Sequence, residues 1–498
     1  MVTLANIIEN NPLTEKAIII PNGPSLSYAS LNDEVDRISS ILSTVGFKKG
    51  VTASIVYENG LEFISVFLAI SKTGATVAPL NPEYTIEEFK FYMSDTNSQF
   101  LILSSESNLS IDAANELSIQ IINTSVNDLG NLSLYKNDTQ LTKMSEPSIP
   151  NPDDIALFLH TSGTTSQPKG VPLTHRNLIS SLMNISNTYK LKVEDSSLLV
   201  MPLFHVHGLI GVALATLFTG GTLIIPPKFS ASTFWHLQNY HNATWYSAVP
   251  TIHQILLMRA NKDNAPQKSF RFIRSCSAAL APSVFADLEN RFGAPVLEAY
   301  GMTEASHQMS SNLLPPFKRS PGTVGKGTGV EISIINDSGS FLKANTSGEI
   351  AIKGENVTFG YHNNPNANSE AFFDGWFRTG DQGEISESGI LKLTGRLKEL
   401  INRGGEKISP LEVDATLIKH PNILEAVCFG ASDEKYGEVV HAAIVPSSSI
   451  SELDIQNFCS TYIADFKIPS KIYIVDQIPR TATGKIQRRN IAKQFNKS

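Results

Sequence analysis

The chain has 498 residues, 41% of them apolar and 17% charged, and this length exceeds what one hydrophobic core organises, so at least two domains are expected. Its formal net charge of -7 gives no basic surface that would hold a phosphate backbone, and nucleic acid is not an expected partner. Three widely spaced cysteines, Cys276, Cys428 and Cys459, form no zinc motif and favour a reducing, intracellular compartment.

The first hundred residues alternate helical and strand patterns. In chain order these predict a helix at 28–45 ended by Gly46, a strand at 53–57, a helix at 61–73, and a helix opened by Thr85 and Glu88 in a capping-box pattern. Such alternation is typical of a parallel sheet covered by helices. The segment 104–152, rich in Ser, Asn and Asp, is expected to be partly irregular.

From residue 154 onward the alternation returns. Strands are predicted at 155–159, 198–203, 222–225, 245–249 and 271–275, with a helix after Thr174. The uncharged stretch 206–227 is interrupted by glycines and prolines, which favours a buried helix, a turn and a strand over a membrane span.

The pattern changes again after residue 330. Short strands and turns predict a small β-rich subdomain at 330–396, and mixed helices and strands follow it to the end. The predicted fold class is therefore α/β, with a large domain at 1–397, made of α/β layers plus that subdomain, and a small α+β domain at 398–498.

A loop of small hydroxyl residues and glycines follows the predicted strand at 155–159. It consists of Thr161, Ser162, Gly163, Thr164, Thr165, Ser166, Gln167, Pro168, Lys169 and Gly170. Backbone N–H groups and hydroxyls can surround phosphate oxygens, and Lys169 adds positive charge, although the spacing is not that of Walker A. Taken alone, such a run would more often be a polar surface loop.

This loop is one of five segments that together resemble the adenylate-forming superfamily of acyl-CoA synthetases, peptide-synthetase adenylation domains and luciferases. The others are Tyr300-Gly301-Met302-Thr303-Glu304, Arg378-Thr379-Gly380-Asp381, Gly395-Arg396-Leu397-Lys398-Glu399 and Thr483-Gly484-Lys485-Ile486. The resemblance covers nearly the whole chain. It implies a ligase that uses ATP and Mg²⁺ to form an acyl-adenylate and then transfers the acyl group to the co-substrate coenzyme A.

The resemblance also implies roles for individual residues. Lys485, Thr303 and Glu304 are expected to be catalytic, because two anionic reactants need positive charge where they meet. Glu304 and Thr164 would hold Mg²⁺, a hard cation that takes oxygen ligands. The expected ATP contacts are Thr161, Ser162, Gly163, Thr164, Thr165, Lys169, Ser277, Glu298, Ala299, Tyr300, Thr303, Asp381, Arg396 and Lys485.

Further implied roles concern coenzyme A and domain movement. Lys398 falls at the superfamily's hinge, around which the small domain would swing after adenylation. Arg403, Gly404 and Gly405 would then bind coenzyme A, because glycines let a pantetheine arm pass close to the backbone.

Three segments resemble the oxalate:CoA ligase branch of the superfamily: MPLFHVHGL at 201–209, RFIRSCSAALAP at 271–282 and TEASHQM at 303–309. A second carboxylate buried beside the first needs hydrogen-bond donors and positive charge, whereas an alkyl tail needs an apolar tunnel. The candidate acid contacts are His205, Arg274, Ser277 and His307. His205 could instead be a core histidine, and Arg274 an ion pair within the sheet.

Other interpretations remain open at this point. The acid could be a medium-chain fatty acid or an aromatic acid, or the chain could be a catalytically weak homologue acting as a binding or scaffold protein. Transfer to a carrier-protein thiol is a third alternative, although no carrier domain is present. Because a Ser-Lys-Leu type C-terminus is lacking, a cytoplasmic location is expected, with a peroxisomal one as the alternative.

Overall fold

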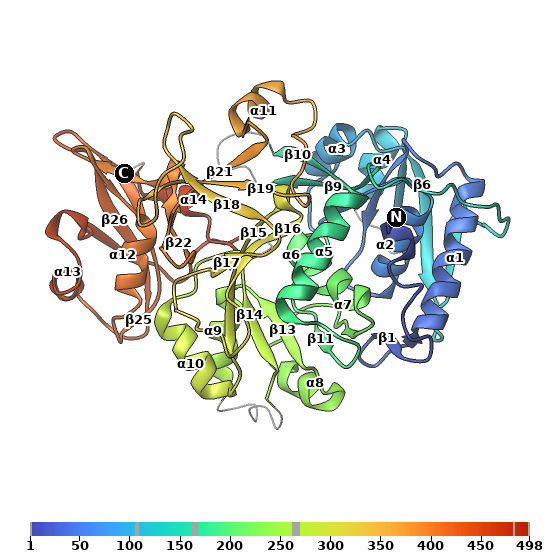
Figure 1. The fold of residues 1–498 in the computed structure, drawn as a ribbon, viewed down its shortest axis with the longest axis horizontal. Coiled ribbons are helices and arrows are strands. Elements are labelled where there is room, and N and C mark those ends of the chain that lie inside the picture. Colours follow the sequence, from blue (N-terminus) through green and yellow to red (C-terminus); the bar gives the residue numbers. More distant parts are fainter. Residues whose placement is uncertain (1, 105–108, 162–167, 261–268, 482–483, 497–498) are drawn as a thin grey trace.

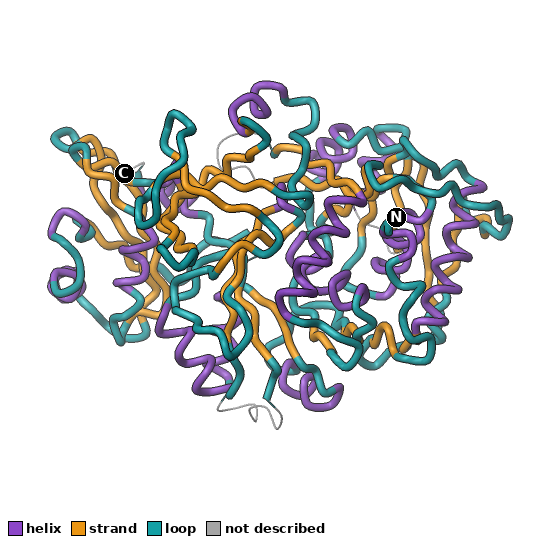
Figure 2. Tube along the Cα trace, in the orientation of Figure 1, coloured by secondary structure: helices purple, strands orange, loops and turns teal. Residues whose placement is uncertain are grey.

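The computed structural model describes residues 2–104, 109–161, 168–260, 269–481 and 484–496. Its strands form four sheets, and helices pack against them (Figure 1, Figure 2). The C-terminal elements, orange to red in Figure 1, lie at the opposite end of the molecule from the N-terminal helices in blue. Among the described residues, no helix combines the length and the apolar character that crossing a bilayer requires.

The first sheet has eight strands in the order β10-β9-β4-β3-β5-β6-β7-β8. They are β3 (Thr52–Val56), β4 (Thr76–Leu80), β5 (Phe100–Ser104), β6 (Gln120–Val126), β7 (Leu132–Lys136), β8 (Thr139–Gln140), β9 (Ile155–Thr161) and β10 (Lys169–Thr174). Strands from β9 to β6 pair in parallel and the edges are antiparallel. The accompanying helices are α1 (Tyr28–Thr44), α2 (Leu61–Lys72), α3 (Ile86–Asp95) and α4 (Leu109–Glu116).

The second sheet has nine strands in the order β17-β16-β15-β14-β13-β11-β12-β1-β2. They are β1 (Lys16–Ile19), β2 (Ser25–Ser27), β11 (Ser196–Leu198), β12 (Thr222–Ile224), β13 (Trp245–Ala248), β14 (Phe272–Ser275), β15 (Val296–Met302), β16 (His307–Ser311) and β17 (Lys326–Gly327). Its helices are α5 (His175–Tyr189), α6 (Val206–Gly208), a π-helical turn (Leu209–Leu214), α7 (Ala215–Phe218), α8 (Phe234–His241), α9 (Pro250–Arg259) and α10 (Pro282–Phe292).

Two five-stranded sheets complete the fold. The third contains β18 (Glu331–Ile335), β19 (Gly348–Lys353), β20 (Phe372–Phe373), β21 (Trp376–Ile385) and β22 (Leu391–Arg396), with helix α11 (Pro365–Ala371). The fourth contains β23 (Ile401–Arg403), β24 (Glu406–Ile408), β25 (Ile423–Asp433), β26 (Gly437–Pro446) and β27 (Lys471–Ile474), with α12 (Pro410–Leu417), α13 (Glu452–Ser460) and α14 (Arg488–Phe495). The fourth sheet has its own hydrophobic core, built around residues such as Ile401, Val413 and Ile444.

The predicted α/β class is confirmed, and so are the local signals that were strongest in the sequence. The capping box at Thr85 forms, with the Thr85 hydroxyl accepting from the Glu88 N–H. The strand predicted at 198–203 is wrong in its extent, because β11 ends at Leu198. Pro202 has no N–H for a ladder, and the side chain of Asn59 bonds the Met201 carbonyl and the Leu203 N–H instead.

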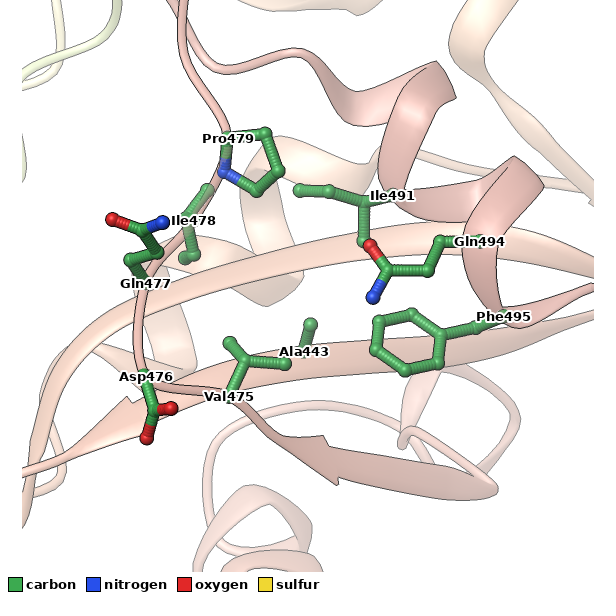
Figure 3. A pocket seen from close by; sticks show the side chains of 9 residues that line it. All are labelled: Ala443, Val475, Asp476, Gln477, Ile478, Pro479, Ile491, Gln494 and Phe495. Carbon is green, nitrogen blue, oxygen red and sulfur yellow. The ribbon is translucent and has the colours of Figure 1, made fainter.

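A cavity of about 370 Å³ opens in the C-terminal part, between α14 and the segment that follows β27 (Figure 3). Apolar side chains, among them Val475, Ile478 and Phe495, line it together with Gln477 and Gln494. No residue predicted to contact ATP, the acid or coenzyme A lines this cavity.

Candidate active site

The phosphate loop connects β9 to β10, which pair as an antiparallel hairpin with Thr161 opposite Lys169. The predicted contacts Ser162, Gly163, Thr164 and Thr165 lie outside the described residues. The described strands β9 and β10 place the two ends of the loop directly opposite each other.

Lys169 is linked to Glu304 through a tyrosine that the sequence analysis did not single out. The Lys169 ammonium lies 4.4 Å from the centre of the Tyr361 ring, and the Tyr361 hydroxyl donates to Glu304 Oε1 at 2.8 Å. Glu304 is buried, and burial raises the pKa of its carboxyl while the bond from Tyr361 acts to lower it. The phosphate loop and the expected Mg²⁺ ligand therefore share one chain of contacts.

Asp381, in β21, accepts hydrogen bonds from Tyr300 in β15 and from Arg396 in β22. The Tyr300 hydroxyl donates to its Oδ2 at 2.5 Å, and the Arg396 Nε donates to its Oδ1 at 2.8 Å. The charge of Asp381 raises the pKa of Arg396, while burial and Asp381 raise the pKa of Tyr300. These contacts join the second and third sheets and fix the carboxylate that was expected to meet the ribose.

Two further predicted ATP contacts, Glu298 and Ala299, are buried in β15. Glu298 Oε1 accepts from the Gly322 N–H at 2.8 Å, and burial raises the pKa of its carboxyl to about 7. Glu298 thus fixes a loop instead of presenting an open carboxylate. Thr303 begins the short 3₁₀ turn that carries Glu304.

Lys485 lies in a hairpin of the C-terminal part. The Thr481 N–H donates to the Lys485 carbonyl and the Gly484 N–H to the Thr481 carbonyl, both at 2.8 Å. The hairpin reaches the residue between β13 and α9, because a Cβ on Gly484 would lie 2.9 Å from Val249 Cγ2. Burial and the nearby charge of Arg396 lower the pKa of the Lys485 ammonium, whereas Glu304 and Asp381 raise it. The structure therefore brings Lys485 together with the residues expected to hold ATP.

Three histidines gather beside this lysine. His207 contacts the Ser277 hydroxyl through Nδ1 at 3.0 Å and the Ser247 hydroxyl through Nε2 at 2.7 Å. The rings of His207 and His307 stack, with centroids 5.2 Å apart and an interplanar angle of 23°. Burial lowers the pKa of all three imidazoles, to about 3 for His205, so they are neutral at pH 7.

Arg274 lies behind these rings and is fully buried. Its Nε donates to the Tyr189 hydroxyl at 2.8 Å, its Nη1 to the Ser247 hydroxyl at 3.2 Å and its Nη2 to Gln308 Oε1 at 3.0 Å. All three acceptors are neutral, and no carboxylate among the described residues pairs with the guanidinium. The alternative of an ion pair within the sheet is therefore wrong, and the positive charge of Arg274 is available to an anionic ligand.

The backbone around the histidines is strained. Ser277, Ser306 and His307 have φ values of 73°, 47° and 94°, which residues with a side chain seldom adopt. The strand pairing of β15 with β16 also requires Gly301, because a Cβ there would lie 2.0 Å from the His307 carbonyl oxygen. Such strain is concentrated where side chains must be aimed at a ligand.

The predicted hinge and coenzyme A residues belong to other elements than those that carry the histidines and Arg274. Lys398 is exposed, in the 3₁₀ turn Leu397–Glu399 between β22 and β23. Gly404 and Gly405, with φ of 60° and 97°, make the turn between β23 and β24. Arg403 donates to the Phe466 carbonyl at 2.6 Å and lies over the Tyr436 ring.

Sequence reasoning missed the residues that hold the predicted ones in place: Tyr189, Ser247, Gln308 and Tyr361. Gln308 and His207 do fall in segments quoted for the oxalate branch, which could have marked them. Tyr361 carries no such signal. Within the described ranges, no cluster of three or more His, Cys, Asp or Glu residues could hold a metal without help from a substrate.

Comparison with known proteins agrees with this geometry. The "AMP-binding enzyme" family model matches residues 6–362, and the "AMP-binding enzyme C-terminal domain" model matches 412–485. The oxalate–CoA ligase of Arabidopsis thaliana is 48% identical over 99% of this chain and 98% of its own length. The oxalate–CoA ligase of Saccharomyces cerevisiae is also 48% identical, over 97% and 95%.

A solved structure extends the likeness to three dimensions. O-succinylbenzoate coenzyme A synthetase from Bacillus subtilis, in complex with ATP and magnesium ion, superimposes with a TM-score of 0.86 at 30% identity, covering 98% of each chain. Family matches to both parts of the chain, near-complete coverage of its relatives and a shared fold lead to one conclusion: the chain belongs to the AMP-binding enzyme family.

Proposed function

We propose that this protein is an ATP-dependent oxalate:CoA ligase, which forms oxalyl-adenylate with release of pyrophosphate and then oxalyl-CoA with release of AMP. The observation that carries the choice of acid is the polar cluster of His207, His307, Ser277 and Arg274 beside Lys485. An alkyl or aromatic tail at this place would meet buried polar groups and an unpaired cation, which oppose it. The 48% identity to two oxalate–CoA ligases supports the same choice.

On the nucleotide side, Asp381 would accept the ribose hydroxyls and Tyr300 would pack against the adenine. Glu304 would be the protein ligand of Mg²⁺, which fits this site because Mg²⁺ commonly takes one or two carboxylates plus substrate phosphates. Mg²⁺ would supply charge neutralisation on the phosphates. Tyr361 fixes the direction of Glu304 Oε1, and its ring also holds the ammonium of Lys169, at the end of the phosphate loop.

Lys485 would bring the acid carboxylate and the α-phosphate together, because both are anionic and repel each other without a cation between them. The side chain comes from the C-terminal part, which has its own core and a separate family match beginning at residue 412. These observations support a boundary between domains at 397/398, with Lys398 as the hinge. The domain at 398–498 would swing after adenylation and bring Arg403, Gly404 and Gly405 to coenzyme A.

We also propose that the protein is located in a reducing compartment of the cell. All three cysteines are buried and unpaired, which supports a reducing compartment such as the cytoplasm, with the peroxisome as alternative.

The test is AMP and pyrophosphate release by the purified protein with ATP, Mg²⁺ and coenzyme A, across oxalate, malonate, acetate, octanoate and coumarate. A clear preference for oxalate is expected. Preference for octanoate or coumarate would overturn the assignment of the acid but not of the ligase. Release of neither product with any acid would favour a binding or scaffold role.

A further inference from the structure

One glycine faces the acid cluster from the helix that follows α6. Gly211 lies in the π-helical turn Leu209–Leu214, where the helix is wider than an α-helix. Such turns are rare and occur often at functional sites. All six residues of this turn are fully buried, so its shape is fixed by packing on both sides.

The imidazole of His307 occupies the space that a side chain at position 211 would need. A Cβ built on Gly211 would lie 2.4 Å from His307 Nε2 and 2.5 Å from Cδ2, much closer than real Cβ atoms come to other atoms. Any residue other than glycine would therefore push the ring away, and the ring could no longer lie 5.2 Å from His207. Since the backbone of His307 is already strained at φ 94°, it has little freedom to adapt.

His307 Nε2 is buried and has no hydrogen-bond partner. A buried polar atom without a partner costs free energy unless a ligand supplies the partner. The Arg274 Nη1 atom approaches the same place, 3.2 Å from the Cβ position of Gly211. An imidazole nitrogen without a hydrogen-bond partner and a buried cation without a carboxylate partner thus both lie near the position where Gly211 carries no side chain.

We propose that Gly211 is a positioning residue for acid binding: by lacking a side chain it lets His307 lie against the π-helical turn, beside Arg274, where the imidazole binds the second carboxylate of a small dicarboxylate. This inference rests on the proposed function and adds a residue to it. Gly211 itself touches no reacting atom. It acts by positioning His307, which donates to the carboxylate, while the charge of Arg274 stabilises the anion through the intervening groups.

The test is a double-mutant cycle with Gly211→Ala, His307→Ala and the double variant. The readouts are kcat/KM for oxalate, from pyrophosphate release, and the Kd for MgATP. Gly211→Ala is expected to lower kcat/KM for oxalate about 10- to 100-fold, as for loss of one hydrogen bond to a charged group. The Kd for MgATP should stay within about twofold, because the three atoms nearest to a Cβ at position 211 belong to His307 and Arg274, and neither residue is expected to hold phosphate.

The double variant tells positioning from a general loss of structure. With the imidazole gone, the nearest remaining neighbour of the new Cβ is Arg274 Nη1 at 3.2 Å, an overlap that a shift of a few tenths of an ångström relieves. Adding Gly211→Ala to His307→Ala should therefore change kcat/KM less than about twofold. Full additivity of the two losses would overturn the proposal, and so would a Gly211→Ala enzyme with wild-type use of oxalate. If Gly211→Ala does not fold, the double variant still gives the decisive comparison with His307→Ala.

The proposed function and the role of Gly211 can fail separately. A wild-type protein that ignores oxalate but activates another acid refutes the proposed function. A wild-type protein that activates oxalate, together with a Gly211→Ala variant that does so equally well, refutes only the role of Gly211.

Discussion

Replacing Lys485 by alanine is expected to abolish acyl-adenylate formation while leaving the fold intact. The hairpin that carries Lys485 is held by its backbone and by Arg480, whose Nη2 donates to Glu425 at 2.7 Å. None of these bonds uses the Lys485 ammonium. The loss should therefore fall on the reaction, and the thermal midpoint of unfolding should change little.

The size of the effect follows from the charge that is removed. One preorganised donor at a developing oxyanion is worth about 100- to 1,000-fold in rate, and a full positive charge in a buried site should contribute at least as much. The pH dependence has a definite sign. Burial and Arg396 lower the pKa of Lys485 from its usual 10.5, so the ammonium, and with it the rate, is lost at a pH below 10.5. A Lys485→Arg control keeps its charge and should lack this alkaline fall.

The two half-reactions are measured separately. Pyrophosphate release reports adenylation, and thioester formation from supplied acyl-adenylate reports the second step, which Lys485→Ala should retain. Pyrophosphate release at the wild-type rate in Lys485→Ala would refute the reasoning. A large fall in the thermal midpoint would show that the side chain has a structural role instead.

Three other changes test the remaining parts of the site. Tyr361→Phe removes a hydrogen bond that lowers the pKa of Glu304, so the carboxylate of the variant should protonate at a higher pH. Its KM for MgATP should then rise about tenfold as pH falls, and a KM that does not change with pH would contradict this. Lys398→Pro fixes φ at the proposed hinge and should spare pyrophosphate release but impair thioester formation; equal loss of both would argue against a hinge. Glu298→Gln keeps an acceptor for Gly322 but cannot ionise. In the wild type the pKa of Glu298 is raised from 4.5 to about 7, so between these pH values the folded state binds more protons than the unfolded state. The free energy of unfolding should therefore fall by roughly 3 kcal/mol as pH rises from 4.5 to 7. Denaturant unfolding of Glu298→Gln should show no such fall.

The residues that a linear motif carries could be predicted from the sequence. Glu304, Asp381 and Lys485 each lie within a few positions of the glycines and hydroxyl residues that identify their segment, so one chain is enough to point to them. The capping box at Thr85 and the buried run 206–227 were predictable for a similar reason, because cap chemistry and glycine positions act over three or four residues.

What could not be predicted depends on distances across the fold. Tyr361 meets Glu304 only because the loop after β19 returns to the end of β15, and a lone tyrosine in a polar stretch carries no sign of this. For Arg274 the sequence left two interpretations open, an acid contact and an ion pair within the sheet, since a buried arginine usually has a carboxylate partner. Its neutral partners come from α5, β13 and β16, three elements that the sequence does not show to be neighbours.

The charges in the site are divided in a way that suits a small dianion. The carboxylates Glu304 and Asp381 lie where the nucleotide is proposed to bind, and Arg274 lies where the acid is proposed to bind. The charge of Lys485 acts on both groups of residues. The imidazoles between them are neutral, because burial and the neighbouring cations lower their pKa. Protonated histidines would add buried positive charge and destabilise the folded protein when no ligand is bound, whereas neutral histidines donate hydrogen bonds without this free-energy cost. The affinity for oxalate should therefore stay the same as pH rises from 6 to 8. A histidine that bound oxalate through its positive charge would instead make the affinity fall over this range.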